Sequence, residues 1–592
     1  MAVNSARQDE QQREVPKVET LLRLFRYMLS YKKELAGAIA LTLVALGVTL
    51  VAPLMIELAI DVYVANKDGE GLLRLAGAAI VLFIIFLMGT RRCMMIMADV
   101  TNRLLLNIRE ELYIHIQSLS FHFFDSRPTG KILARIIGDV NSLKDILSDS
   151  VTKLIPDLLT VTGVAVIMLI KNWKLAMAAL LMLPVLVLSM FLIQFKAHKL
   201  WQIHRKKNSN LNAFIHEDIS GIRIVQSFVA EPETQEDFAV FSEDHRASFV
   251  NAVRIADLFT PLVEITWGVG GFLLYYIGIC IVGAEHVGIG TFIAFSTYIG
   301  MFWSPIRNLA SFYNKIVTNI SAAERIFDIL DTPAEITDSA GAYDLLTIKG
   351  NVSFSNVSFA YTDEPDRLVL ENVSFEVKAG ETIALVGPTG AGKTTIVNLI
   401  SRFYDVTSGK ISIDGHDIRA VTLESLRKQM GVMTQDTFLF SGTIRENICY
   451  GRPDATEEEM IAAAKAVHAH SFIMEMEKGY DTEVSEHGAK ISIGQRQLLA
   501  FARTMLSNPG ILILDEATSS IDTHTEILVQ AGIQALLKSR TSFVIAHRLS
   551  TIRGADRIFY VDDNRIVEEG NHRELMAKKG SYYKLYQSQF EE

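Results

Sequence analysis

Cysteine is scarce in this chain of 592 residues, and its scarcity excludes two kinds of site. The three cysteines, Cys93, Cys280 and Cys449, lie far apart and lack the close spacing of metal ligands or of a disulfide framework. The chain also lacks a basic tract, and its formal net charge is −10. Because proteins that bind nucleic acid usually carry a basic patch or stripe, we expect no nucleic-acid partner.

The pattern of a removable signal peptide is missing too, because residues 1–14 are polar and lead to no small-residue cleavage site. Long apolar runs are abundant, but only in the first half of the chain. Six runs approach the ~20 residues that a helix needs to cross ~30 Å of hydrocarbon; they cover residues 35–60, 75–97, 154–170, 175–195, 258–282 and 289–317. The second half is punctuated by Gly, Asp and Glu, which is typical of a soluble α/β domain.

Two long stretches between the apolar runs, residues 98–149 and 196–254, are compatible with helices but charged. Pro and Gly break the first stretch at residues 125–130, and a Gly breaks the second near residue 221. Lys and Arg are concentrated in these stretches and before the first run, whereas the other connections hold few. This bias predicts that both stretches, both termini and the soluble half lie in the cytoplasm. We expect an integral membrane protein.

Residues 20–31 place Leu21, Leu24, Phe25 and Met28 on one face of a helix, which favours a helix in the membrane interface over an ordinary surface helix. The predicted domains are therefore a polar tail (1–19), a helical membrane domain (20–330), a linker (331–347) and a soluble domain (348–592).

A few charged residues fall in or near the predicted spans, where charge is costly. They either line a polar pathway or lie close enough to a helix end for the charge to reach water. The second interpretation suits Glu264, inside the fifth run, least well; the five residues are Glu57, Arg91, Arg92, Glu264 and Arg307.

The soluble half contains the pattern G-x-x-x-x-G-K-[ST] after a strand-like run and before an apolar-periodic segment. Such a loop directs backbone N–H groups at phosphate oxygens, while its Lys adds a positive charge and its Thr hydroxyl can bind Mg²⁺. The predicted phosphate loop comprises Gly387, Pro388, Thr389, Gly390, Ala391, Gly392, Lys393, Thr394 and Thr395.

Further candidate residues surround this loop in the sequence. Tyr361 precedes it and can stack on a nucleotide base, although an aromatic residue at a strand edge would look the same. An apolar strand, residues 511–514, ends in Asp515 and Glu516, an arrangement in which the first carboxylate holds Mg²⁺ and the second polarises water. Another apolar strand delivers His547 at its carboxyl end, where ligands bind in such sheets.

With these motifs in order, nearly the whole chain resembles a half-transporter of the ATP-binding cassette (ABC) exporters. The resemblance implies six long transmembrane helices fused to an α/β P-loop nucleotide-binding domain that binds ATP and Mg²⁺. It assigns an aromatic base contact to Tyr361, the Q-loop and a metal contact to Gln435, a metal contact to Asp515, the catalytic carboxylate to Glu516, the D-loop to residues 520–522 with Asp522, and the switch histidine to His547. The breaks at 125–130 and 217–222 resemble the two short coupling helices that press on the nucleotide domains.

One family element differs from its usual form. The signature loop, L-S-G-G-Q in the family, reads here as Ile491, Ser492, Ile493, Gly494 and Gln495. In these transporters this loop closes over ATP held by the opposite chain, with Ser492, Gly494 and Gln495 as its contacts. Ile493 adds a β-branched side chain where Gly allows close approach, so we expect weaker closure. The preceding residues 482–488 also differ, at Ser485 and His487.

These features together predict an exporter subunit that uses ATP to move an amphiphilic drug, lipid or peptide across the bilayer by alternating access. The partner is a second half-transporter; the intact Glu516 beside an altered signature favours a heterodimer, and a homodimer stays open. Lipid flipping or chelate import on the same fold, and an ATP-gated channel or regulatory subunit, are the alternatives.

Overall fold

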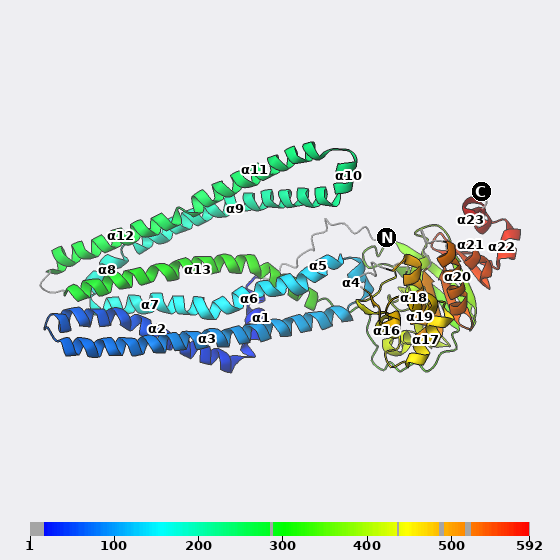
Figure 1. Cartoon of the computed structure of the whole chain (residues 1–592), viewed down its shortest axis with the longest axis horizontal. Coiled ribbons are helices and arrows are strands. Elements are labelled where there is room, and N and C mark those ends of the chain that lie inside the picture. Colours follow the sequence, from blue (N-terminus) through cyan, green and yellow to red (C-terminus); the bar gives the residue numbers. More distant parts are fainter. Residues whose placement is uncertain are drawn as a thin grey trace. The chain divides into compact units, whose positions relative to one another are not determined.

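The structure is a computed structural model, and it describes residues 17–283, 288–434, 437–484, 491–515, 523–546 and 548–590. The chain divides into two compact units, which we treat separately. The helical unit contains Glu10–Ile114 and Leu133–Asp331, and the sheet unit contains His115–Ile132 and Thr332–Glu592. Figure 1 shows the whole chain.

Long helices make up the helical unit. The sheet unit also includes the last residues of α3, the whole of α4 and most of α5. The helices are α1 (Lys17–Leu29), α2 (Lys32–Leu58), α3 (Gly69–Ser118), α4 (Phe121–Asp125), α5 (Thr129–Ala134), α6 (Val140–Asp149), α7 (Ile155–Lys171), α8 (Trp173–Leu180), α9 (Leu183–Ser220), α10 (Ile222–Ser227), α11 (Glu231–Ala256), α12 (Phe259–Ile277) and α13 (Ile289–Leu330). Short π-helical turns, Ala59–Val64, Arg135–Asp139, Ser150–Leu154 and Gly278–Gly283, continue several of them.

Within the described residues, five helical segments are long and apolar enough to cross a membrane: Lys32–Val64, Gly69–Ser118, Thr129–Lys171, Trp173–Ser220 and Glu231–Cys280. The sixth predicted run lies in α13, where a shorter apolar stretch covers Ile289–Phe302. The predicted tight link after residue 170 is also found. Asn172 ends α7, and its side chain accepts hydrogen bonds from the backbone N–H of Lys174 and Leu175 to begin α8.

Helices α9 and α11 pack along each other as an antiparallel pair joined by α10 (Figure 1). The turn falls at Gly221, as the sequence predicts. Helix α1 buries Thr20, Leu24 and Met28, which are spaced four residues apart, and its Arg23 pairs with Asp331 at 2.7 Å. The predicted position of α1 in the membrane interface stays a prediction.

The sheet unit is built on a six-stranded sheet of order β12-β11-β3-β10-β9-β6, in which the five strands from β11 to β6 are parallel and β12 is antiparallel. A four-stranded antiparallel sheet has the order β2-β1-β4-β5. The strands are β1 (Val352–Ala360), β2 (Leu368–Val377), β3 (Thr382–Val386), β4 (Ser408–Ile413), β5 (His416–Asp417), β6 (Met430–Met433), β7 (Gly442–Thr443), β8 (Glu483–Val484), β9 (Ile511–Asp515), β10 (Thr541–Ile545), β11 (Arg557–Asp562) and β12 (Arg565–Gly570).

Two apolar cores cover the two faces of the six-stranded sheet. In β3, Ile383 and Leu385 face one core, which also contains the four-stranded sheet, whereas Ala384 and Val386 face the other. Successive strand side chains point to opposite faces, so a strand buried on both sides is apolar throughout. The helices of this unit are α14 (Lys393–Ile400), α15 (Leu423–Arg427), α16 (Ile444–Cys449), α17 (Glu457–Ala466), α18 (His470–Glu475), α19 (Ile493–Ser507), α20 (Thr523–Leu537), α21 (Leu549–Gly554), α22 (His572–Lys578) and α23 (Ser581–Phe590).

Candidate nucleotide-binding site

The predicted phosphate loop connects the buried strand β3 to α14, as the sequence indicates. Two of its glycines are required by their surroundings. Gly387 has φ 144°, and a Cβ there would lie 2.1 Å from the carbonyl oxygen of Val561. Gly392 has φ 99°, and a Cβ there would lie 3.1 Å from the carbonyl oxygen of Val369. Only glycine fits both the backbone conformation and the space.

The side chain of Lys393 folds back over the loop. Its Nζ donates hydrogen bonds to the carbonyl oxygens of Gly387 (2.8 Å) and Pro388 (2.7 Å). Burial lowers the pKa of this ammonium, and the nearby carboxylate of Asp515 opposes that shift. Pro388, Thr389 and Gly390 form an exposed rim, and Thr394 is exposed at the first turn of α14. The loop thus combines one positive charge, an exposed stretch of backbone and a hydroxyl at a helix N-terminus. This combination suits a polyphosphate.

Strand pairing brings the other predicted residues to the same edge of the sheet. Ile545 of β10 pairs with Leu385 of β3 and with Asp515 of β9, so these three parallel strands end side by side. The phosphate loop and Asp515 therefore share this edge. Gln435, Glu516, Asp522 and His547 lie outside the described residues, although β9 ends directly before Glu516.

Tyr361 follows β1 and is half-buried. Its hydroxyl lies 3.1 Å from Thr395 Oγ1, at the end of the phosphate loop, which places the ring beside the loop. Burial raises the pKa of Tyr361, and the hydrogen bond with Thr395 partly opposes this. The ring meets Phe359 and Tyr404 edge-on, with centroids 4.9 and 5.3 Å apart. The structure thus joins Tyr361 to the predicted phosphate loop, and its role as a base contact stays a prediction.

The altered signature loop begins helix α19. Ser492 accepts a hydrogen bond from the backbone N–H of Gln495, and the Gln495 side chain accepts one from the Ser492 N–H, which together form a capping box. Ile493 is the first helical residue and is 44% exposed, while Gly494 is buried. The isoleucine side chain is therefore partly exposed to solvent at the start of the helix. Ser485 and His487 lie outside the described residues.

Sequence reasoning missed this capping box, although the pattern Ser-x-x-Gln before an apolar run was visible. It also missed Tyr404 and Asp125, whose hydrogen bond joins α4 to the strands around Tyr361. A lone Tyr and a lone Asp separated by 279 positions carry no local pattern. No sequence signal could have paired them.

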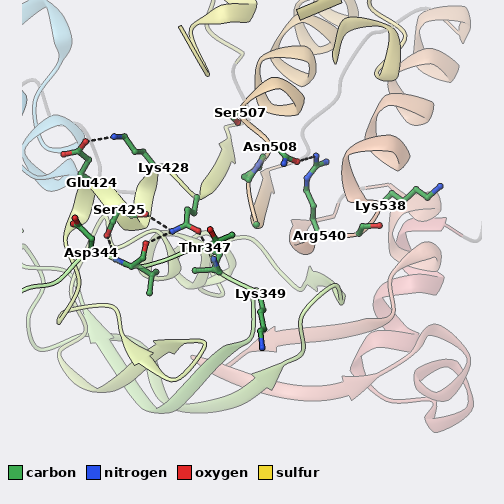
Figure 2. A pocket seen from close by; sticks show the side chains of 16 residues that line it. Asp344, Thr347, Lys349, Glu424, Ser425, Lys428, Ser507, Asn508, Lys538 and Arg540 are labelled. Atoms are coloured by element: carbon green, nitrogen blue, oxygen red, sulfur yellow. Dashed lines mark hydrogen bonds and ion pairs between the residues drawn. The ribbon is translucent and has the colours of Figure 1, made fainter. Parts of the chain in front are cut away.

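A polar groove of about 770 Å³ lies at the opposite edge of the sheet, before the first residues of β6, β9 and β10 (Figure 2). Gln429 spans its floor by accepting from the Ile348 N–H and donating to the carbonyl oxygens of Leu345 and Leu346. Arg540 donates to the carbonyl oxygen of Leu536, the penultimate residue of α20, as basic residues commonly do at helix C-termini. The hydrogen bonds of Gln429 thus hold the segment before β1 against the sheet. The groove is separate from the phosphate loop.

The charged residues predicted near the spans have different environments. Glu57 pairs with Lys171 at 2.7 Å and accepts a hydrogen bond from Thr291 at 2.9 Å, so it joins three helices. Arg91, Arg92 and Glu264 are exposed, and the side chain of Arg307 lies outside the described set. Asp61, which sequence reasoning passed over, accepts from the backbone N–H of Gly290 and of Thr291 at the start of α13.

Comparisons with known proteins agree with this architecture. The family model of the ABC transporter transmembrane region matches residues 35–306, and that of the ABC transporter domain matches residues 370–519. The chain is 41% identical to the ABC transporter ATP-binding protein YknV of Bacillus subtilis (strain 168), covering 96% of this chain and 94% of that protein. It is 38% identical to the ATP-dependent lipid A-core flippase of Syntrophus aciditrophicus (strain SB), covering 97% and 95%.

A solved structure, that of a bacterial Atm1-family ABC exporter with ATP bound, aligns with a TM-score of 0.77 and 30% identity over 95% of this chain and 99% of that chain. The phosphate loop at the edge of a parallel sheet, the fused membrane helices and these relatives lead to one conclusion. The chain belongs to the ABC transporter family, as an integral membrane exporter subunit whose ATP-binding domain hydrolyses ATP to drive transport.

Proposed function

We propose that this chain works as half of an exporter in which two nucleotide-binding domains close head to tail over two ATP molecules. The common carboxyl edge of β3, β10 and β9 carries the proposal, because it collects the phosphate loop, Asp515 and the chain leading to Glu516 and His547. Lys393 would leave its backbone acceptors for the phosphate oxygens. Closure would then turn the membrane cavity outward, and hydrolysis would reset it.

Oxygen ligands of the kind that Mg²⁺ prefers are present at this edge. The exposed hydroxyl of Thr394 and the carboxylate of Asp515 fit a hard cation, with Gln435 as a further proposed ligand. When bound, Mg²⁺ would neutralise charge on the phosphates. Glu516 would polarise the attacking water, His547 would stabilise the γ-phosphate, and Tyr361 would stack on the adenine.

The substitution Glu516→Gln tests these roles. We expect it to reduce ATP turnover by at least about 100-fold while ATP still binds, because the amide cannot polarise water as a base. Glu477→Gln makes the same chemical change at an exposed site in the same domain and should leave turnover unchanged. If Glu516→Gln kept normal turnover, the assignment of the catalytic carboxylate would be wrong.

We further propose that the partner is a different half-transporter. The two ends of this chain's nucleotide chemistry differ. The residues proposed to hold ATP are of the usual type, whereas the signature loop, which would close over the partner's ATP, carries Ile493, exposed at the start of α19. Strong, cooperative ATP hydrolysis by the chain purified alone would contradict a heterodimer and support a homodimer.

We propose an amphiphilic substrate, with lipids among the candidates, since the spans are mainly aliphatic and one relative is named as a lipid A-core flippase. Transport in reconstituted vesicles distinguishes the alternatives. Accumulation of a fluorescent lipid or drug against its gradient, lost in Glu516→Gln, supports a pump, whereas downhill flux without turnover supports an ATP-gated channel. Accumulation on the side holding ATP would indicate import.

The bacterial relatives support location in an inner or plasma membrane. The distribution of Lys and Arg supports an orientation with the nucleotide-binding domain and both termini in the cytoplasm. Labelling of single cysteines with an impermeant maleimide in intact cells tests this orientation. A cysteine in place of the exposed Phe228, at the end of α10, should react only after the membrane is opened.

A further inference from the structure

Helix α4, which belongs to the sheet unit, packs against the rest of that unit through side chains that are not among the proposed nucleotide contacts. The hydroxyl of Tyr404 donates a hydrogen bond of 2.6 Å to Asp125 Oδ2. Beside it, the rings of Phe121 and Phe403 lie 4.2 Å apart, and His122 Nε2 lies 3.3 Å from Asp363 Oδ1. The helix is thus attached at both of its ends.

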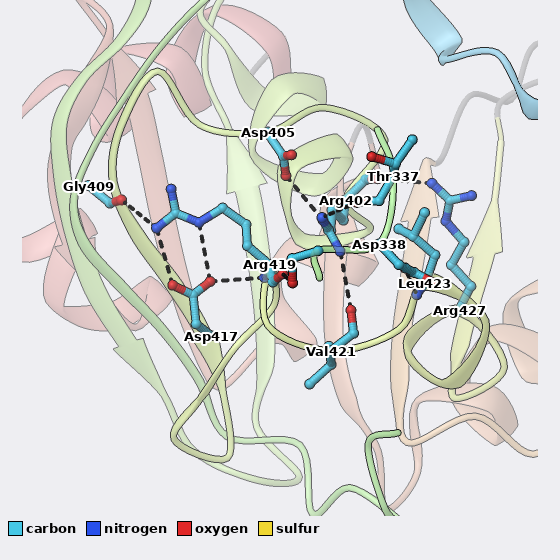
Figure 3. A network of polar contacts seen from close by, with 11 residues as sticks. Thr337, Asp338, Arg402, Asp405, Gly409, Asp417, Arg419, Val421, Leu423 and Arg427 are labelled. Carbon is cyan, nitrogen blue, oxygen red and sulfur yellow. Dashed lines mark hydrogen bonds and ion pairs between the residues drawn. The ribbon is translucent and has the colours of Figure 1, made fainter. Parts of the chain in front are cut away.

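The loop that carries Phe403 and Tyr404 is held in place by hydrogen bonds of the neighbouring Arg402. Arg402, which is 2% exposed and has φ 49°, donates to Asp405 (3.1 Å) and to the carbonyl oxygens of Val421 (3.3 Å) and Thr337 (3.1 Å). Figure 3 shows this network. Arg427 donates to the carbonyl oxygen of Arg402 and lies over the ring of Phe403. A residue held in the left-handed region by three acceptors fixes the loop in one conformation.

Tyr404 lies between α4 and Tyr361. Its side chain is 7% exposed, its hydroxyl binds α4, and its ring meets the ring of Tyr361 edge-on at 5.3 Å. Burial raises the pKa of Tyr404, and the carboxylate of Asp125 raises it further, so the hydroxyl remains a proton donor at any physiological pH. A continuous chain of contacts therefore runs from Thr395 through Tyr361 and Tyr404 to Asp125.

We propose that Tyr404 is a positioning residue that transmits occupancy of the base site at Tyr361 to helix α4. The inference rests on the proposed function, because base stacking on Tyr361 is part of it. A base on one face of Tyr361 restricts that ring, the edge contact restricts Tyr404 in turn, and the hydrogen bond to Asp125 then holds α4 more firmly. Because such coupling is reciprocal, a displaced α4 also weakens base binding.

Amide hydrogen exchange of residues 121–125 measures the effect in the full chain, reconstituted in lipid nanodiscs and carrying Glu516→Gln so that ATP stays intact. ATP with Mg²⁺ should slow exchange in α4 by about tenfold, the change expected of one hydrogen bond to a charged acceptor. Tyr404→Phe removes only the hydroxyl. It should bind ATP within about twofold of the parent, but ATP should no longer slow exchange in α4.

Matched variants separate transmission from simple damage. Asp125→Ala should lose the response, Asp125→Asn should keep part of it through its amide oxygen, and the double variant Tyr404→Phe with Asp125→Ala should lose no more than either alone. Tyr343→Phe removes the hydroxyl that bonds His416 in the same unit and should respond as the parent does. Tripolyphosphate, which has no base, should not slow exchange in α4.

Two results would contradict the proposed role of Tyr404. One is a normal slowing of exchange in α4 by ATP in Tyr404→Phe, and the other is an equal slowing by tripolyphosphate. Failure of the proposed function looks different. In that case Lys393→Ala would bind ATP as tightly as the parent, and Tyr361→Ala would leave ATP affinity unchanged.

Discussion

Arg325 of α13 donates two hydrogen bonds, of 2.9 and 2.6 Å, to the carboxylate of Asp139, which lies 186 positions earlier in the chain. Arg135 adds a third at 3.1 Å, and the Asp139 side chain is 11% exposed. Closer to the N-terminus of α13, Asn319 donates to the carbonyl oxygen of Ser142, and Lys315 donates to Asp149 at 2.7 Å. These polar contacts fix the register of α13 against the α5–α6 segment beyond the apolar part of the spans.

The first prediction concerns this register. Asp139→Ala leaves two largely covered guanidinium groups without their acceptor, so we expect a loss of about 2 kcal/mol or more in stability, seen as a melting temperature several degrees lower in detergent. Glu243→Ala breaks an Arg–Glu pair whose side chains are both mostly exposed and should change the melting temperature little. Equal effects of the two substitutions on the melting temperature would show that burial of the ion pairs of Asp139 adds nothing to stability.

The second prediction concerns the base contact. Tyr361→Ala should weaken the binding of a fluorescent ATP analogue by about tenfold, since stacking of one base on an aromatic ring contributes about 1–3 kcal/mol. Tyr361→Phe keeps the ring and loses only the contact with Thr395, so its affinity should stay close to that of the wild type. Unchanged affinity in Tyr361→Ala would place the base elsewhere.

The third prediction concerns the exposed isoleucine of the signature loop. Ile493→Gly should raise ATP turnover by the chain purified alone, by about threefold to tenfold, because it allows closer approach of the opposite phosphate to the start of α19. Ile493→Ala removes the β-branch but keeps a Cβ, and it should give an intermediate rate. If turnover fell in both variants, Ile493 would contribute to closure instead of hindering it.

The fourth prediction concerns acid stability. His572 lies against Tyr582, with its Nδ1 2.7 Å from the hydroxyl, and burial followed by the charge of Arg553 lowers the pKa of its ring below the ordinary 6.5. As the pH falls below 6.5, His572 binds a proton more readily in the unfolded chain than in the folded chain. The free energy of unfolding therefore decreases. The melting temperature of His572→Gln should therefore fall less than that of the wild type between about pH 7.5 and about pH 5.5. The same decrease in both proteins would contradict this role.

Much of the fold could be predicted because its determinants are local. The apolar runs and the phosphate loop follow from spacing alone, and the structure places Gly387, Gly392 and Lys393 as that spacing predicts. The contacts of Tyr404 and Arg402 could not be predicted, because each depends on partners supplied by distant segments. A buried arginine with a left-handed backbone reads in the sequence as an ordinary surface residue. Tertiary context decides its position.

The uninterrupted helix α3, Gly69–Ser118, constrains how this chain can change in evolution. An α-helix advances about 100° and 1.5 Å per residue, so one inserted residue would turn every later side chain of α3 by more than a quarter of a circle. Asn107 and Glu111, which bond Tyr31 and Tyr27, would then face away from their partners. A seven-residue insertion would nearly restore their direction but displace them by about 10 Å. We therefore expect related chains to vary in residue identity along this helix and to keep its length.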